Sequence, residues 1–539
     1  MTAALPSPFL KTLGFRVLAC FLVLWTPFFV FVAYRGYPIP PLSLLYSAGF
    51  CVLLSLLLGA ICGRGGDIRQ TIVFACLVAL FLDIQFDWFS DAIAYLVFAL
   101  MLALFWVLRR HLAMILSAVF AVLLVSTAVL GPTETYREVA TTEREAAPGA
   151  GAGPAGIVHL LLDEHAGILG IPEDLPGGEA LRQDLRAFFV SNGFRLFGGA
   201  VSEYQSSKSS ISGMLNFTAG PHPYERYQGK RPYVLTKNAY FEALSEAGYR
   251  IEVHQSTYMD FCREQAELIS RCDTYRYDGT DWLKDSALSD FGKLSFLFGM
   301  YLQLSDYAES ALKLYARRGP DLRGLGIDLP PLLEWDDSPS SLNAMAAFDR
   351  MVDQLAAGTA GKLYFAHLLL PHGPYAFDAQ CRLRSEFSSW ASNRPPYRKA
   401  NSEDERSLRY QLYFDQVRCM QRRLQALFDR LRSAGLYADT TIVIHGDHGA
   451  RINLVVPRAQ NRESLSTQDY LDNFSTLFAA KSPAFQAGYE DELVPASRLL
   501  AEAIGRPDLV PSPVSELVLY LEGDKDEEPW TAVPWRFPE

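Results

Sequence analysis

Five long apolar runs in the first 131 residues constrain the fold of this chain more than any other feature. A helix needs about 20 apolar residues to cross the hydrocarbon core of a bilayer, and each run approaches or reaches that length. A cleaved signal peptide would explain only the first run, and a soluble core rarely contains five such helices with so little charge between them. The sequence therefore predicts a transmembrane domain of five helices over residues 1–131, with apolar runs at Phe15–Tyr34, Leu42–Cys62, Thr71–Phe86, Ala92–Leu108 and Leu112–Leu130.

The basic residues of this region lie almost entirely on one side of the runs. Six of its seven Lys and Arg residues precede the first run or lie in the second and fourth connections, and only Arg35 lies on the opposite side. The positive-inside rule then predicts a cytoplasmic N-terminus, and five spans would place the rest of the chain outside the cytoplasm. The third run is the weakest because Asp83 interrupts its end. A re-entrant segment there would leave four crossings and reverse the prediction.

The cysteines agree with an extracytoplasmic location. Four lie in the apolar runs, where a thiol behaves as a small apolar group, and an even set of four, Cys262, Cys272, Cys381 and Cys419, lies in the rest of the chain. Such a set suits two disulfides in an oxidising compartment, and three pairings are open. A zinc site is the alternative, although no C-x-x-C pair occurs.

A linker and an α/β domain are expected after the membrane region. Residues 132–156 become rich in Ala, Gly and Pro, which is typical of a linker. Over residues 157–525 short apolar runs alternate with amphipathic stretches, which predicts a mostly parallel sheet with helices on both faces. Residues 281–341 contain no clear strand and are expected to form an insertion or a helical cap, and the acidic residues 526–539 a solvated tail. The expected strands are Ile157–Leu162, Tyr249–His254, Leu363–Leu370 and Thr440–His445, and the expected helices are Glu179–Asn192, Lys237–Ala247 and Arg406–Ala434.

Polar residues directly follow three of the expected strands. These strands end in HLLLDEH, which contains Asp163, in HLLLPHGPY, which contains His372, and in TIVIHGDHGARI, which contains Asp447 and His448. Ligands of open parallel sheets bind at the carboxyl ends of the strands. Each of these residues alone would more often be a helix cap or a turn former, but carboxylates and imidazoles converging from separate strands are typical ligands of zinc, manganese or magnesium. The set therefore predicts a divalent metal centre.

A serine-rich segment, SEYQSSKSSISGML, supplies a candidate nucleophile. It lies between an expected strand at Arg195–Ala200 and an expected helix that begins near Ser209. A hydroxyl at a helix N-terminus faces free amides and the positive end of the helix dipole, and a metal ion would activate it further. A simple helix cap is the alternative reading of this segment. Its position between the other motifs favours the nucleophile.

The order of these features resembles that of the membrane-anchored transferases of the alkaline phosphatase and sulfatase superfamily. These include the phosphoethanolamine transferases of Gram-negative envelopes and lipoteichoic-acid synthase. Membrane spans, a linker, a strand ending in an acid, a Ser or Thr at a helix start, a late Pro-His and a final Asp-His-Gly follow one another in the same order. The resemblance implies an alkaline phosphatase/sulfatase-like α/β sandwich. It also implies the bacterial inner membrane, with the catalytic domain in the periplasm.

The resemblance further implies a metal site. Its first acidic ligand is often Glu in the transferases and Asp in the sulfatases and phosphatases, and Asp163 corresponds to it here. One divalent ion is expected, with zinc or manganese favoured, and a second ion is an open alternative. The implied ligands of the first ion are Asp163, Ser207, Asp447 and His448, and the residues available for a second ion are Glu164, His165 and His445.

The nucleophile implied by the resemblance is Ser207. The family pattern T-x-x-S-[IL]-x-x-[ML]-L matches SSKSSISGML with Ser207 in place of the Thr, and either hydroxyl can be phosphorylated. Ser206 and Ser209 are the alternatives if the register shifts. His372 corresponds to the His that holds the phosphoryl group of the substrate. Neither C-x-P-x-R nor S-x-P-x-R occurs here, so sulfate-ester hydrolysis through formylglycine is not expected.

The expected function is transfer of a phospho-substituent, of the phosphoethanolamine or phosphoglycerol type, through a covalent phospho-serine. The expected donor is a membrane phospholipid, and the expected acceptor is an envelope glycan or lipid. A phosphatase, a phosphodiesterase or a sulfatase-like hydrolase of the same fold is one alternative, and a catalytically silent membrane scaffold is another. Beyond residue 131 the chain carries 42 basic and 56 acidic residues, which argues against a nucleic-acid partner. A monomer is expected.

Overall fold

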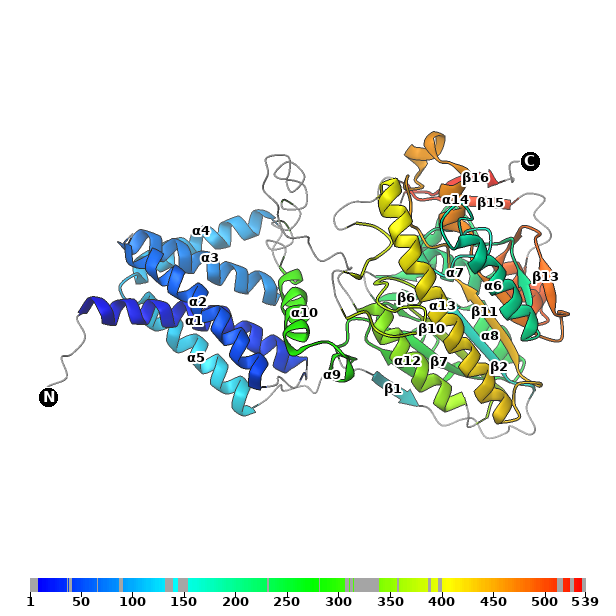
Figure 1. Cartoon of the computed structure of the whole chain (residues 1–539), viewed down its shortest axis with the longest axis horizontal. Helices are drawn as coiled ribbons and strands as arrows, with labels where there is room; N and C mark the ends of the chain where they lie inside the picture. The colour runs from blue at the N-terminus through cyan, green and yellow to red at the C-terminus, as the bar shows by residue number, and fades with distance from the viewer. Residues whose placement is uncertain are drawn as a thin grey trace. The chain divides into compact units, whose positions relative to one another are not determined.

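The computed structural model divides the chain into two compact units (Figure 1). The first comprises Met1–Arg137 and Leu283–Leu332, and the second comprises Glu138–Trp282 and Leu333–Glu539. The structure describes residues 8–35, 37, 41–64, 66–86, 91–130, 139–143, 154–229, 232–280, 282–305, 310, 314, 339–355, 358–385, 389–395, 400–510, 517–523 and 528–535.

Apolar helices form the first unit, and each of the five predicted runs is helical. Phe74, Phe105 and Phe120 lie in its buried core together with Ala19 and Leu116. Side chains that would face lipid remain exposed in the isolated chain, as the lipid-facing surface of a membrane protein requires. The helices are α1 (Pro8–Tyr34), α2 (Pro41–Arg64), α3 (Gly66–Phe86), α4 (Asp91–Leu108) and α5 (Leu112–Leu130).

Three of these helices are candidate membrane spans, so the predicted count of five is wrong for the part of the chain that the structure describes. α1, α2 and α5 are long and apolar enough to cross a bilayer, over Leu13–Tyr34, Leu42–Gly63 and Leu112–Leu130. The described apolar part of α4 is limited to Tyr95–Leu108. α3 carries charged residues near both of its ends, including Asp83. The membrane prediction itself holds with fewer spans.

A sixth helix of the first unit comes from the middle of the sequence. α10 (Asp290–Gln303) packs against α1 through two T-shaped contacts, in which the rings of Phe298 and Tyr301 each lie 5.6 Å from that of Phe28. Just after α10, the Ser305 hydroxyl donates a hydrogen bond to Asp83 Oδ2 at 2.6 Å. The region expected to be an insertion or a helical cap of the catalytic domain therefore contributes a helix to the membrane unit.

The second unit is built on a nine-stranded sheet, in the order β1-β9-β7-β10-β2-β11-β12-β3-β13. Its central strands, from β9 to β11, are all parallel, and β12 is antiparallel to both of its neighbours. The predicted mostly parallel α/β fold is thereby confirmed. The strands are β1 (Val139–Glu143), β2 (Ile157–Leu162), β3 (Arg195–Phe197), β7 (Arg250–Ser256), β9 (Ile269–Tyr275), β10 (Lys362–Leu368), β11 (Thr441–Gly446), β12 (Phe478–Lys481) and β13 (Gly488–Glu490).

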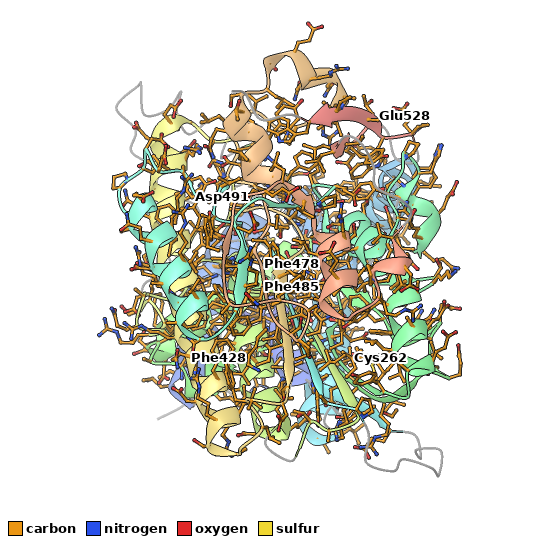
Figure 2. The ribbon with its side chains drawn as sticks, turned by 90° about the vertical axis from the view of Figure 1, so that its right-hand side faces the viewer. Cys262, Phe428, Phe478, Phe485, Asp491 and Glu528 are labelled. Carbon is orange, nitrogen blue, oxygen red and sulfur yellow. A yellow bond between two sulfur atoms is a disulfide. The ribbon has the colours of Figure 1, made fainter. Side chains whose placement is uncertain are left out.

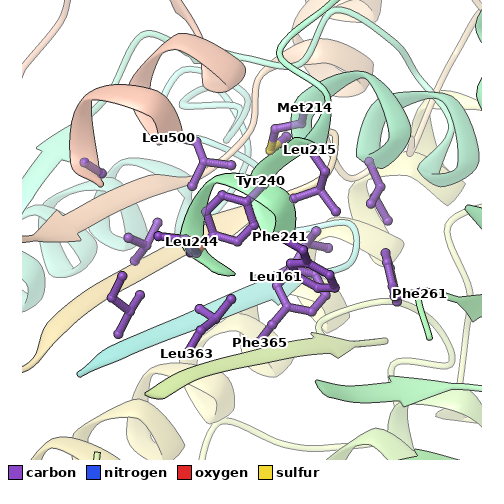
Figure 3. Close-up of a cluster of buried hydrophobic side chains, with 14 of the residues drawn as sticks. Leu161, Met214, Leu215, Tyr240, Phe241, Leu244, Phe261, Leu363, Phe365 and Leu500 are labelled. Carbon is purple, nitrogen blue, oxygen red and sulfur yellow. The ribbon is translucent and has the colours of Figure 1, made fainter. Parts of the chain in front are cut away.

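Helices cover both faces of this sheet. On one face, Leu363 and Phe365 of β10 lie against Phe241 and Leu244, within the core shown in Figure 3. On the other face, α12 and α13 lie over the strands (Figure 1). The helices of the first face are α7 (Ser207–Leu215), α8 (Ala239–Glu246) and α15 (Ala496–Ala503), and the remaining long helices are α6 (Gly178–Ser191), α12 (Ser340–Leu355) and α13 (Glu403–Ser433).

Aromatic contacts link strands β12 and β3 near the β13 edge of the sheet. Phe197 of β3 lies with its ring centroid 5.9 Å from Phe478 of β12 and 5.1 Å from Phe485. Figure 2 labels Phe478 and Phe485, which both contact Phe197. α6 and α13 pack through the stacked rings of Phe188 and Phe428, 5.8 Å apart. Such contacts add to the burial of apolar surface that stabilises the sheet.

Two disulfides form, as predicted, and the structure selects one of the three pairings. Cys262 is bonded to Cys272 of β9, and Cys381 is bonded to Cys419 of α13. The second disulfide ties the loop after β10 to the helix that covers the sheet. The predicted disulfides agree with an oxidising compartment.

Two segments expected to lack regular structure form strands. β1, within the expected linker, pairs antiparallel with β9, where Val139 faces Tyr275. In the expected C-terminal tail, β16 (Thr531–Trp535) pairs with β15 (Leu517–Leu521). Val533 of β16 and two leucines of β15 pack against α14 (Thr467–Phe474). Burial of these apolar side chains gives the tail a defined position.

Candidate metal centre and nucleophile

Strand register brings the predicted metal ligands to one edge of the sheet. Leu162, the last residue of β2, pairs with Gly446, the last residue of β11. Asp163 and Asp447 follow these two residues and therefore leave the sheet side by side. His448 comes next, and all three side chains are buried. Their ligand atoms lie within 4.8 Å of one another.

The hydrogen bonds around these ligands leave acceptors that suit a cation. Asp447 Oδ1 accepts the backbone N–H groups of Glu164 and His448, both at 2.9 Å. Asp447 Oδ2 and Asp163 Oδ1 are buried without a hydrogen-bond partner, which is costly for carboxylate oxygens. A divalent ion would satisfy both oxygens. The residues present therefore fit a divalent metal.

The imidazole of His448 is oriented as a ligand. Its Nδ1 lies 2.9 Å from the carbonyl oxygen of Gly449, which can only accept a hydrogen bond, so Nδ1 carries the proton. The lone pair of Nε2 is then free, and Nε2 lies 3.2 Å from Asp447 Oδ2. Backbone contacts of this kind commonly fix the tautomer of a metal-binding His.

The two ligand carboxylates differ in their electrostatics. Burial raises the pKa of Asp163, but the imidazoles of His367, His372 and His448 outweigh it and hold this pKa well below its usual range. Burial and the negative charge of Asp163 raise the pKa of Asp447. Two buried carboxylates in contact therefore resist ionising together without a compensating cation.

Ser207 is the first residue of α7 and faces the ligands. Its Oγ lies 3.4 Å from Asp163 Oδ2 and 3.2 Å from His448 Nε2. The helix begins slightly earlier than the sequence predicts, and Ser206, with extended backbone, precedes its first residue. The Ser206 hydroxyl donates instead to Ser209 Oγ, at 3.3 Å. Of the three candidate serines, Ser207 is the one that the structure places at the ligands.

His372 lies beside this cluster. Its Nε2 is 3.8 Å from Glu164 Oε1, and its Nδ1 is 2.7 Å from the carbonyl oxygen of Gly373. Burial lowers the pKa of His372, but the charges of Glu164 and Asp163 outweigh burial and raise it above the usual value. An imidazole with a raised pKa can give and take protons near neutral pH.

Of the three residues considered for a second ion, only Glu164 lies at the centre. His445 instead points into the core, where its Nε2 lies 2.6 Å from Nε2 of His159 and its Nδ1 lies 2.7 Å from the carbonyl oxygen of Gly446. Burial lowers the pKa of His445 to about 4 and that of His165 also to about 4. Among the described residues, neither histidine belongs to a group of potential ligands.

Three further residues at the site were not singled out from the sequence. His367 of β10 has its Nε2 3.5 Å from Asp163 Oδ2. The Arg451 guanidinium and the Asn393 amide both donate to Glu164 Oε1, with Nε at 3.0 Å and Nδ2 at 2.9 Å. His367 lies in the motif HLLLPHGPY and Arg451 in TIVIHGDHGARI, so the sequence offered a signal for both residues. Asn393 lies in a loop without such a signal.

Comparison with known proteins identifies the family of this domain. The sulfatase family profile matches residues 235–505, just over half of the chain. This range contains His372, Asp447 and His448 but begins after Asp163 and Ser207. The search of curated proteins finds no match.

Solved structures of low sequence identity are also similar. A phosphonate monoester hydrolase of Agrobacterium radiobacter is 10% identical, with a TM-score of 0.39 over 68% of this chain and 80% of that chain. A lipoteichoic acid synthase from Listeria monocytogenes is 12% identical, with a TM-score of 0.35 over 69% and 78%. A protein in the alkaline phosphatase superfamily from Vibrio parahaemolyticus is 13% identical, with a TM-score of 0.34 over 72% and 83%.

Proposed function

We propose that this chain, which belongs to the sulfatase family, is a membrane phosphotransferase that uses Ser207 as its nucleophile. It would move a phosphoethanolamine or phosphoglycerol type of group from a phospholipid to an envelope glycan or lipid. The observation that carries the proposal is the buried Ser207 hydroxyl, 3.2 Å from His448 Nε2 at the start of α7. The absence of a C-x-P-x-R or S-x-P-x-R motif around Ser207 favours a covalent phospho-serine over the formylglycine route of sulfatases.

The first half of the reaction forms the covalent intermediate. A divalent ion held by Asp163, Ser207, Asp447 and His448, with zinc or manganese favoured, would supply Lewis-acid stabilisation of negative charge. Ser207 loses its proton to water, and its Oγ attacks the phosphorus of the phospholipid. The bond between phosphorus and the lipid alcohol breaks, and protonated His372 gives its proton to the leaving oxygen. The products are diacylglycerol and a phospho-substituted Ser207.

The second half of the reaction transfers the group to the acceptor. Neutral His372 now takes a proton from the acceptor hydroxyl, whose oxygen attacks the phosphorus. The bond between phosphorus and Ser207 Oγ breaks, and Ser207 regains a proton from water. Backbone N–H groups at the start of α7 face the phosphoryl oxygens and favour their negative charge. If water instead of a glycan or lipid took the group, the same residues would make a phosphodiesterase.

The membrane unit supports a lipid donor. With α1, α2 and α5 as spans, the number of crossings stays odd, and the basic clusters of the second and fourth connections both lie between α2 and α5. Only Arg35 then lies on the opposite side, as with five spans. We therefore keep the orientation with a cytoplasmic N-terminus in the bacterial inner membrane and a periplasmic catalytic unit.

Reporter fusions test this orientation. A reporter that works only outside the cytoplasm is expected to be active when fused after Gly156 and inactive when fused after Arg110. A cytoplasmic reporter should give the reverse pattern. Activity of the cytoplasmic reporter after Gly156 would contradict the orientation and, with it, the lipid donor of the outer leaflet.

Mass spectrometry tests the proposed chemistry. The purified full chain is incubated with phosphatidylethanolamine or phosphatidylglycerol, quenched with acid, and digested. We expect one peptide containing Ser207 to gain the mass of the phospho-headgroup, with release of diacylglycerol. When an envelope glycan or lipid is added as acceptor, release of a free phospho-headgroup without any acceptor product would favour the hydrolase. No adduct and no turnover with either lipid would favour the silent scaffold.

Replacement of His372 by alanine separates proton transfer from metal binding. We expect His372→Ala to lower the rate of transfer by about 10² to 10⁴-fold, the usual contribution of a general acid or base. The metal content, measured by inductively coupled plasma mass spectrometry, should remain at the wild-type level because His372 is outside the proposed ligand set. A metal loss as large as that of a ligand variant would place His372 among the ligands.

A further inference from the structure

A second group of potential ligands adjoins the proposed metal site. Ligand atoms of Asp163, Glu164 and His372 lie within 4.8 Å of one another, and Asp163 also belongs to the first group. A carboxylate shared by two such groups is an arrangement that two-metal enzymes use. The number of ions that this centre holds therefore depends on what else contacts Glu164.

Glu164 is already engaged by a cation. Arg451 directs Nε and Nη2 at Glu164 Oε1, with the Nε contact at 3.0 Å. The amide of Asn393 donates to the same oxygen at 2.9 Å. The other oxygen of Glu164, Oε2, is buried without a hydrogen-bond partner. We infer that the Arg451 guanidinium, rather than a second divalent ion, neutralises the charge of Glu164 and limits the centre to one.

Arg451 is held in place rather than free to swing away. Its backbone N–H donates to the carbonyl oxygen of Asp472 at 2.8 Å. Its Nη1 lies 3.5 Å from the carbonyl oxygen of Gln205, in the loop that leads to Ser207. Both Arg451 and Glu164 adopt left-handed backbone conformations, with φ of 56° and 62°. Non-glycine residues occupy this region at a cost, and such residues concentrate at functional sites.

The charges of the site agree with one ion plus one arginine. Three carboxylates, Asp163, Glu164 and Asp447, meet at this edge of the sheet, and together they carry three negative charges when ionised. One divalent ion and the permanently charged guanidinium balance them before any proton on His372 is counted. A second divalent ion would lie close to the guanidinium, and like charges at such short range repel each other. It would bind well only if the arginine were absent.

Metal stoichiometry tests this inference, which rests on the metal centre of the proposed function. The purified full chain is loaded with zinc or manganese, freed of excess metal, and analysed by inductively coupled plasma mass spectrometry. We expect one ion per chain for the wild type and two for Arg451→Ala and Arg451→Gln, since both variants release Glu164 from its cation. Arg451→Lys keeps the positive charge and should bind one ion. The control Arg458→Ala should also bind one ion, because Arg458 pairs with Glu522 and not with Glu164.

Reversal by a second substitution completes the test. Adding Glu164→Gln to Arg451→Ala should return the stoichiometry from two ions to one. Two ions in the wild type, or one ion in the folded Arg451→Ala and Arg451→Gln variants, would overturn the inference about Arg451. A wild type that binds no ion would instead overturn the metal centre itself, so the two failures are distinguishable.

An independent observation concerns α10. Although the sequence on both sides of it belongs to the second unit, α10 packs in the first unit, where Tyr301 lies 5.6 Å from Phe31 and Phe298 lies 6.2 Å from Phe50. Both rings are on the buried side of the helix, whereas Phe291 is 66% exposed. We propose that α10 is a second anchor that holds the catalytic unit on the membrane helices without the help of residues 132–156.

Cleavage of the linker tests this anchor. A protease site is inserted between residues 131 and 138 of the full chain, so that β1 stays with β9 on the catalytic fragment. The chain carries an N-terminal affinity tag and is purified in mild detergent. After cleavage we expect the catalytic fragment to stay on the affinity resin with the tagged fragment. The double variant Phe298→Asp, Tyr301→Asp should release it, and the control Phe291→Asp should not. Release of the catalytic fragment that carries none of these substitutions would overturn the proposal.

Discussion

Ser207→Ala is expected to lower phospho-group transfer at least about a thousandfold, the scale of loss seen when a covalent nucleophile is removed. The Ser207 hydroxyl lies 3.2 Å from His448 Nε2 and 3.4 Å from Asp163 Oδ2, so its loss removes the attacking oxygen from the centre of the site. The remaining ligands still hold a cation. We therefore expect thermal unfolding close to the wild type, most of the metal retained, and no adduct on the peptide that contains residue 207.

Ser206→Ala provides the matched control for this variant. Ser206 precedes α7, and its hydroxyl contacts Ser209 rather than the ligands. We expect Ser206→Ala to keep most of its activity and its phospho-serine adduct. Wild-type activity in Ser207→Ala, together with its loss in Ser206→Ala or Ser209→Ala, would show that the nucleophile has been assigned to the wrong serine.

Asp447→Asn and His448→Ala are expected to lower metal affinity by more than about 100-fold, since even residues that only support metal ligands contribute 10 to 100-fold. Asp447 Oδ2 is a buried oxygen without a hydrogen-bond partner, and an amide at this position would lose the negative charge that attracts the cation. Transfer activity should fall in parallel with metal occupancy. Isothermal titration of the metal-free full chain with zinc or manganese measures the affinity directly.

Two controls make the loss of metal specific. Asp429→Asn changes an exposed acid of α13 that pairs with Arg432 and should leave the affinity unchanged. Adding excess zinc or manganese should restore part of the activity of Asp447→Asn, but none of that of Ser207→Ala, which lacks the nucleophile. Unchanged metal affinity in both ligand variants would exclude the proposed centre.

Local sequence patterns were enough to identify the polar residues that follow the strands. A buried parallel strand reads as a short apolar run, and the polar residues after it must leave the core, so Asp163, His372 and Asp447 could be identified without any knowledge of strand order. The same locality explains why the apolar helices could be predicted. The span count differs because α3 carries charged residues near both of its ends and because the described apolar part of α4 is limited to Tyr95–Leu108.

Local sequence patterns could not predict contacts between segments that are far apart in the sequence. Which cysteines pair, and where α10 packs, depend on how separate elements approach one another. The C-terminal strand β16 appeared to be part of a solvated tail because its acidic neighbours dominate the local composition, whereas its burial comes from packing with α14. Sequence periodicity carries no information about such partners.

The sequence by itself determined the chemistry available to this protein: apolar helices for a membrane, acids and histidines at strand ends, and a serine at a helix start. Only the tertiary structure decided which of them meet. The pairing of Leu162 with Gly446 sets Asp163 beside Asp447, and the turn after β11 aims Arg451 at Glu164 instead of at solvent. A one-residue slip in register would turn each side chain to the opposite face of the sheet. The proposed metal ligands therefore meet because the buried faces of the strands allow a single register.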